Sequence, residues 1–173
     1  TDADELIDYA PKEEEDLSII YRLLEKRNCY RKKNGAKEIL ESYGKLVVID
    51  NIPSIKIIDQ SFSRFLISEA MILFGDLLSN YTRVNNIPVP YRVQELASAN
   101  NKQINSQSDN EVLNNYLLKK RMAKSYYTTK ALPHNSLGLK SYLHATSPIR
   151  RYSDLLVHYQ INRFLNNIAL ITK

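Results

Sequence analysis

A serine followed directly by a proline, late in the chain, leaves the backbone few choices. Ser147 is typical of a helix N-cap and Pro148 of a first helical residue, because proline lacks the N–H group that would have no partner there and its φ is already helical. The pair therefore predicts that a helix begins here. Apolar residues recur in steps of three and four, which predicts a buried face made of Ile149, Tyr152, Leu155, Leu156 and Tyr159.

A second line of residues on this predicted helix carries charge. Arg150, Asp154 and His158 follow one another at intervals of four. The amides of a first helical turn have no partner within the helix and carry partial positive charge, so an arginine beside them would complete a site for an anion such as phosphate. The alternative is a capped surface helix whose Arg150, Asp154 and His158 form ion pairs worth a few tenths of a kcal/mol each.

The rest of the chain predicts a mixture of helices and short strands. Asn34-Gly35 ends the first helix, Asn51-Ile52-Pro53 separates two β-branched runs, and the apolar residues of the second helix leave so little polar face that we expect a central core helix. The predicted helices are 13–33, 61–84 and 109–124, and the predicted strands are 45–50, 54–59 and 126–129. The fold class is therefore α+β, a helix-rich portion of a mixed domain with a small antiparallel sheet, and residues 1–173 form one domain.

Composition and charge exclude several classes of protein. Hydrophobic residues make up 43% and charged residues 25% of the chain, which is ordinary for a soluble domain. The net charge of +5 mildly favours an anionic partner, and a single cysteine, Cys29, argues against a disulfide framework or a cysteine metal site. Without a long apolar stretch or a signal pattern, we expect no membrane contact and a cytoplasmic location. The chain begins with Thr1, so we also expect it to be processed or a piece of a longer protein.

The run from Thr146 to Tyr152, Thr-Ser-Pro-Ile-Arg-Arg-Tyr, is preceded by His144 and followed by the run from Asp154 to His158. This pattern resembles the signature of the ribonuclease II/R (RNB) family. Upstream, the run Tyr-Arg-Val-Gln-Glu at 91–95 is similar to the family's Tyr-Arg-Val-His-Glu. The resemblance spans roughly residues 10 to 165. It implies part of a magnesium-dependent 3′→5′ exoribonuclease that hydrolyses single-stranded RNA to nucleoside 5′-monophosphates.

The resemblance also implies roles for individual residues. Arg150 matches the arginine that contacts the phosphate at the reaction centre, where positive charge stabilises the transition state. Thr146, Arg151 and Tyr152 match positions that shape the site or bind the RNA backbone. Glu69 matches one of two adjacent acidic residues, one of which contacts RNA; the alternative is that it lies on a polar helix edge near Arg64 or Asp76. The basic end of the first helix, with Arg27, Arg31, Lys32 and Lys33, either contacts RNA or compensates the helix dipole.

The resemblance places the Mg²⁺ ligands outside this chain. In the family they are clustered aspartates at the start of the catalytic domain, and no such cluster in a matching context is present here, so we expect the metal to be held by the upstream remainder of the same domain. Two departures, Ile39 where an aromatic stacks on RNA and Ser68 where an acid stands, motivate the alternative of an RNA-binding module without catalysis. A third possibility is a structural helical protein whose signature has no RNA role.

Overall fold

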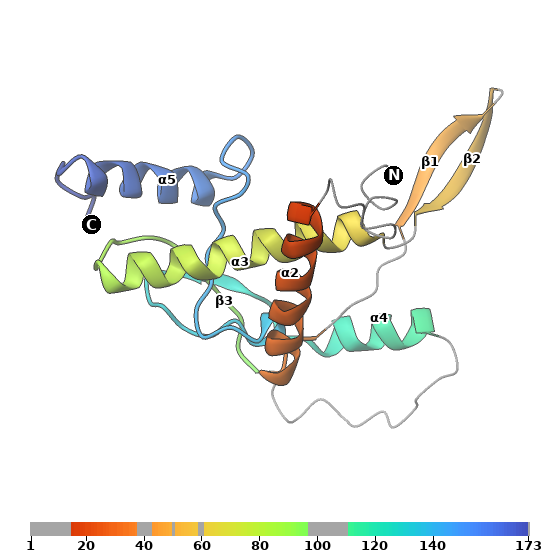
Figure 1. Cartoon of the computed structure of the whole chain (residues 1–173), viewed down its shortest axis with the longest axis horizontal. Helices are drawn as coiled ribbons and strands as arrows, with labels where there is room; N and C mark the ends of the chain where they lie inside the picture. Colours follow the sequence, from red (N-terminus) through yellow and green to blue (C-terminus); the bar gives the residue numbers. More distant parts are fainter. Residues whose placement is uncertain (1–14, 38–42, 50, 59–60, 97–110, 173) are drawn as a thin grey trace.

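The computed structural model describes residues 15–37, 43–49, 51–58, 61–96 and 111–172 (Figure 1). In chain order these ranges hold α2 (Glu15–Lys33), β1 (Tyr43–Ile49), β2 (Ile52–Ile58), α3 (Phe62–Val84), β3 (Tyr91–Val93), α4 (Glu111–Arg121), β4 (Tyr126–Thr128), the 3₁₀ turn η2 (Asn135–Leu137) and α5 (Tyr152–Leu165). Helices combined with two separate two-stranded antiparallel sheets confirm the predicted α+β class. None of the helices in these ranges is long and apolar enough to cross a lipid bilayer.

Helix α3 runs through the middle of the molecule, and α2 crosses it (Figure 1). α3 begins where predicted because the hydroxyl of Ser61 accepts a hydrogen bond from the amide of Arg64 at 3.4 Å, which caps the helix. α2 ends at Lys33, and Gly35 follows at φ 88°, a backbone conformation that glycine adopts without strain. Both predicted helices are confirmed.

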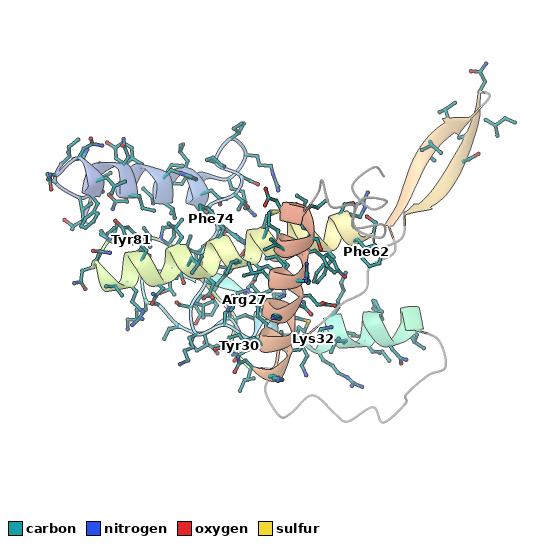
Figure 2. All side chains as sticks on the ribbon, viewed as in Figure 1. Arg27, Tyr30, Lys32, Phe62, Phe74 and Tyr81 are labelled. Atoms are coloured by element: carbon teal, nitrogen blue, oxygen red, sulfur yellow. The ribbon has the colours of Figure 1, made fainter. Side chains whose placement is uncertain are left out.

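The side of α3 that faces the protein carries small and polar residues. Glu69, Gly75, Ser79 and Thr82 are buried, whereas most of the large apolar residues are exposed. The helix is central, as expected. The expectation that its large apolar residues form the core is wrong, because most of them are exposed. The exposed residues are Phe62, Ile67, Met71, Phe74, Leu77, Tyr81 and Val84, of which Phe62, Phe74 and Tyr81 are labelled in Figure 2.

The segment between η2 and α5 passes α3 at Gly75. A Cβ atom at that position would lie 2.4 Å from the ring of Tyr142 and 2.5 Å from the carbonyl oxygen of Leu143, so only glycine allows the segment to pass this close. One turn further along α3, the hydroxyls of Ser79 and Ser141 are 2.8 Å apart and hydrogen-bonded. This crossing fixes the segment that leads into the signature run against the central helix.

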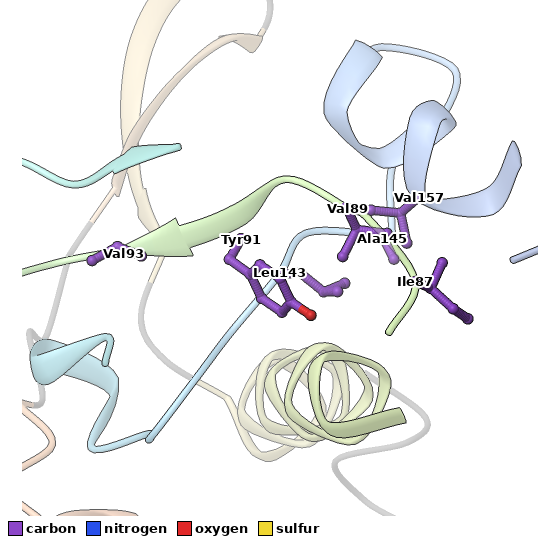
Figure 3. Close-up of a cluster of buried hydrophobic side chains, with 7 residues drawn as sticks. All are labelled: Ile87, Val89, Tyr91, Val93, Leu143, Ala145 and Val157. Carbon is purple, nitrogen blue, oxygen red and sulfur yellow. The ribbon is translucent and has the colours of Figure 1, made fainter. Parts of the chain in front are cut away.

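The hydrophobic core lies between α3 and α5 (Figure 3). It joins the residues around β3 to the segment after the crossing and to α5. The segment around β3 is aligned with the segment after the crossing by backbone pairing. Tyr91 pairs with Leu143 in antiparallel fashion, and the amide of Arg92 donates to the carbonyl of Tyr142 at 2.8 Å. The cluster consists of Ile87, Val89, Tyr91, Val93, Leu143, Ala145 and Val157.

Strands β1 and β2 form a hairpin that projects away from the helices (Figure 1). The antiparallel register pairs Ile49 with Ile52, and Asn51 adopts φ 60° in the tight turn between them. The predicted strand pair is confirmed, although Pro53 lies inside β2, opposite Val48, and not in the turn. The predicted strand at 126–129 is also confirmed, since β4 pairs with β3, and so is the helix at 109–124, which is α4.

The predicted start and buried face of α5 are both wrong. Arg151, with φ −126° and ψ 117°, is the extended N-cap residue, so the helix begins four residues after Pro148. Ser147 and Pro148 instead open a turn, a use of proline that the sequence pattern does not distinguish from a helix start. The buried residues of α5 are Asp154, Val157 and Gln160, whereas the predicted face is exposed at Ile149, Tyr152, Leu155 and Tyr159.

Candidate functional site

The signature run forms a turn that is held from the inside. The amides of Arg150 and Arg151 donate to the carbonyl of Ser147 at 3.2 and 3.0 Å, which closes the turn. One carboxylate oxygen of Asp154 accepts the amide of Ser147 at 2.9 Å and the Arg151 guanidinium at 2.7 and 3.0 Å. The other accepts the hydroxyl of Ser153 at 3.1 Å. Asp154, in the first turn of α5, therefore ties together both ends of the turn.

The Asp154 carboxyl is fully buried and accepts hydrogen bonds on both oxygens. Burial, the largest single influence, raises its pKa, but the hydrogen bonds from Arg151, Ser147 and Ser153 together outweigh burial and hold the pKa below the ordinary value. The predicted pairing of Asp154 with Arg150 or His158 is wrong. Its partner is Arg151, and His158 instead makes a hydrogen bond of 2.7 Å through Nε2 to the carbonyl of Ala145.

Arg150 lies on the outer side of this turn and is exposed. Its neighbours Ile149 and Tyr152 are also exposed, by 102% and 77%. No ion pair of Arg150 is found among the described residues, whereas the adjacent Arg151 is neutralised by Asp154. Because the helix begins later than predicted, the positive charge offered to an anion at this turn comes from Arg150 and not from a pair of arginines beside free helical amides.

A row of aromatic and histidine rings supports the turn from the β3–β4 side. The guanidinium of Arg92 lies 4.6 Å from the ring centroid of Tyr127. The hydroxyl of Tyr127 is hydrogen-bonded to Nδ1 of His144 at 2.8 Å and lies 3.2 Å from the hydroxyl oxygen of Ser153. Tyr142 continues the row, with its ring centroid 5.4 Å from that of His144. The row connects the small sheet to the first turn of α5.

Burial and positive charge keep His144 neutral, and likewise His134, whose ring centroid lies 5.6 Å from that of Tyr142. Burial, followed by the nearby charge of Arg151, lowers the pKa of His144 to about 4. Burial, followed by Arg92, lowers the pKa of His134 to about 4. At neutral pH the imidazole of His144 is therefore neutral and carries one ring proton.

Glu69 lies apart from the turn, in a buried ion pair between α2 and α3. Its carboxylate oxygens accept from the Arg31 guanidinium at 2.7 and 2.5 Å, and Asn28 donates to it at 3.2 Å. Neither of the partners considered in the sequence, Arg64 or Asp76, contacts Glu69. Asp76 instead pairs with Arg27, so two arginines of the basic end of α2 bind carboxylates of α3 and do not simply compensate the helix dipole.

The structure therefore gathers Thr146, Arg150, Arg151 and Tyr152 on one turn and leaves Glu69 inside the α2–α3 interface. The hydroxyl of Thr146 accepts from Arg151 at 3.3 Å. Ser68 precedes Glu69 and is exposed, lining a cavity of about 160 Å³ with Lys32 and Lys37 among others. Ile39 lies outside the described residues.

The sequence analysis missed the support given by Tyr127 and Ser153. In the run at 91–95, Arg92 contacts Tyr127, and Glu95 accepts the hydroxyl of Tyr126 at 2.8 Å. The signal that could have found Tyr127 is the predicted strand at 126–129, since pairing it with the segment at 91–95 places Tyr127 directly opposite Arg92.

The described residues do not fit a magnesium site. No group of three or more His, Cys, Asp or Glu side chains among them is arranged to hold a metal ion. The two fully buried carboxylates, Asp154 and Glu69, are both occupied by arginines. We therefore derive no step through a metal from this part of the chain.

Comparison with known proteins gives the family of this chain. The family model of the RNB domain matches residues 1–167. The chain belongs to the RNB domain family. An uncharacterized ribonuclease of Synechocystis is 33% identical over 177 residues, which cover 98% of this chain and 26% of that protein. The chloroplastic/mitochondrial ribonuclease II of Arabidopsis thaliana is 29% identical over 94% of this chain and 21% of its own length. The chain thus spans about a quarter of the length of these RNB relatives.

Solved structures share the fold of this RNB segment. An active-site mutant of the Dss1 exoribonuclease from Candida glabrata superposes with a TM-score of 0.81 at 25% identity, over 99% of this chain and 24% of that one. Mycoplasma genitalium RNase R, solved in complex with ribose-methylated single-stranded RNA, has a TM-score of 0.71 at 22% identity, over 86% of this chain and 28% of that one. The yeast pseudonuclease Ssd1 has a TM-score of 0.60 at 15% identity, over 91% and 24%.

Proposed function

We propose that this RNB segment supplies the phosphate-contacting arginine of a magnesium-dependent 3′→5′ exoribonuclease that degrades single-stranded RNA to nucleoside 5′-monophosphates. Membership of a family of ribonucleases supports the hydrolytic chemistry. The observation that carries the proposal is the contrast between two adjacent arginines. Arg151 is neutralised by buried Asp154, and this pair braces the turn. Arg150 is exposed on the same turn. A cation fixed in this way can stabilise negative charge that develops on a phosphodiester.

Thr146 and Tyr152 flank this cation on the exposed side of the turn, where they can contact the sugar–phosphate backbone. Glu69 acts indirectly in this proposal, because its bidentate pair with Arg31 holds α2 against α3. Direct contact of Glu69 with RNA remains a prediction. Mg²⁺ would neutralise the phosphate and activate water, and in this proposal its ligands are residues other than those described.

The proposal is tested by Arg150→Ala in the intact protein. Because removing one donor that stabilises charge in a transition state typically costs 10²–10³ in rate, we expect the shortening of 5′-labelled single-stranded RNA to slow about 100-fold, with partial recovery in Arg150→Lys. The control is Arg22→Ala, which removes an exposed arginine of α2 and should leave the rate unchanged. Undiminished shortening of the RNA by Arg150→Ala would refute the proposal.

A second candidate function is RNA binding without hydrolysis. It is favoured by Ser68, which replaces an acid of the family pattern, and by the shared fold with a pseudonuclease. The intact protein with Mg²⁺ distinguishes the two candidates. If it binds single-stranded RNA with normal salt dependence but releases no mononucleotides, the binding function is correct.

A further inference from the structure

A groove of about 720 Å³ is lined by residues outside the signature turn. It lies between the second half of α2, the second half of α3 and the loop at 131–141, and we call it the α2–α3 groove. The segment that crosses α3 at Gly75 separates the two places: Lys140 and Ser141 line the groove before the crossing, and the signature turn follows it. In Figure 1 this segment passes from the side of η2 to the loop that precedes α5.

The charge of the α2–α3 groove favours an anionic ligand. Its lining carries three cations, Arg27, Arg83 and Lys140, against one carboxylate, that of Asp76. Asp76 is already paired with Arg27, which leaves Arg83 and Lys140 to offer charge to a ligand. Arg83 donates to the amide oxygen of Asn80 at 2.7 Å, so its guanidinium is oriented by a neutral group and keeps its full charge.

Arg27 also has an unsatisfied donor beside this groove. Its Nε is buried and has no hydrogen-bond partner among the described residues. A buried donor without a partner costs roughly 1–3 kcal/mol, which is a reason to expect a ligand or a shifted side chain that satisfies it. Arg27 lines the groove, so a shift of its side chain would let a phosphate or carbonyl oxygen of a ligand there accept this hydrogen bond.

Tyr30 gives the groove a stacking surface. Its side chain is 53% exposed, and the guanidinium of Arg27 lies 5.5 Å from the ring centroid (Figure 2). An exposed aromatic ring beside arginine is the combination on which bases of single strands stack without regard to sequence. The amides of Asn34, Asn80 and Asn135 add neutral hydrogen-bonding groups to the same lining.

We propose that the α2–α3 groove is a second binding site for single-stranded RNA, with a base stacked on Tyr30 and phosphates at Arg83 and Lys140. The inference rests on the proposed function only for the kind of nucleic acid. The site is independent of Arg150, so its binding and the chemistry at the signature turn can be measured separately.

Binding of a short ribose-methylated oligouridylate to the intact protein tests the proposal, since this probe reports affinity without turnover. We expect Tyr30→Ala to weaken binding about tenfold, and Tyr30→Phe to bind normally, because stacking needs the ring and not the hydroxyl. The matched control is Tyr116→Ala on α4, which removes a tyrosine of similar exposure, 58%, outside the groove.

The phosphate contacts are tested by salt dependence. Each phosphate contact on a single strand contributes about 0.7 to the slope of log Kd against log salt, so Arg83→Gln combined with Lys140→Gln should lower that slope by about 1.4. Lys120→Gln combined with Lys124→Gln makes the same change of charge on and just beyond α4 and should lower it less. Ultraviolet crosslinking followed by mass spectrometry should place a nucleotide adduct on Tyr30.

The outcomes separate this inference from the proposed function. If Arg150→Ala abolishes nucleotide release while the groove variants bind the probe normally and no adduct forms at Tyr30, the groove is not an RNA site and the proposed function stands. If Arg150→Ala is fully active but the groove variants lose binding as described, the second site is correct and the proposed role of Arg150 is not.

Discussion

Asp154 shows why a charged residue could be found in the sequence but its partner could not. The spacing of four among Arg150, Asp154 and His158 suggested ion pairs along a helix. The extended conformation of Arg151 delays the helix, so the residue that reaches Asp154 is Arg151. Burial of the carboxylate depends on packing against distant segments, which helical spacing does not report.

We expect Asp154→Asn to destabilise the protein by about 3 kcal/mol. The asparagine can still accept the amide of Ser147, but it leaves the partly buried guanidinium of Arg151 without a counter-charge. Breaking a fully buried pair from one side typically costs 3–5 kcal/mol, and the partial exposure of Arg151 favours the lower end of this range. Urea unfolding measures the change. Asp16→Asn removes an exposed carboxylate of α2 and should change the free energy of unfolding by less than about 0.5 kcal/mol. Equal effects of the two variants would contradict the role given to Asp154.

At the level of secondary structure, the sequence predicted which elements exist better than which faces they bury. Ser61 and Gly35 mark helix ends that depend on local chemistry, and these were correct. The faces of α3 and α5 depend on what packs against them. On α3 the closest neighbour is the crossing segment, which requires the small residues Gly75 and Ser79, and so the large apolar side chains lie on the other side.

Gly75→Ala tests this crossing, because the sign of the change in the free energy of unfolding depends on how closely the segment passes. In the interior of a helix with open surroundings, this change stabilises a protein by up to about 1 kcal/mol, because alanine has the higher helix propensity. Here the added Cβ atom meets the Tyr142 ring and the Leu143 carbonyl, so we expect the free energy of unfolding to fall by about 2 kcal/mol or more in urea unfolding. An unchanged or increased stability would show that the segment does not pass α3 as closely as described.

For the whole molecule, stability should depend on two histidines that are neutral in the folded state. The pKa values of His134 and His144 are both lowered to about 4, mainly by burial, whereas an unfolded chain binds these protons near pH 6.5. The unfolded state therefore binds more protons between these values. The contribution of the histidines is complete above pH 6.5 and is lost as the pH falls towards 4.

We expect the free energy of unfolding to fall between pH 6.5 and pH 4 by at most about 1.4 kcal/mol per pH unit for each histidine, and by less for half-buried His144, because solvent screens it. Asp154 contributes to the free energy of unfolding in a lower pH range. Because its pKa is lowered in the folded state, this stabilisation is lost only as the pH falls below the unfolded value near 4. Urea unfolding at a series of pH values measures both ranges. His134→Gln should reduce the slope in the upper range whatever its effect on absolute stability.

The anchoring of the signature turn by Asp154 has a consequence for how this protein can change over evolution. Because the anchor lies beneath the turn, Ile149, Arg150 and Tyr152 contribute little to folding, and each can be exchanged with little loss of stability. Their identities then reflect selection by whatever molecule touches them from outside. A library randomised at these three positions should yield mostly folded variants that differ in recognition.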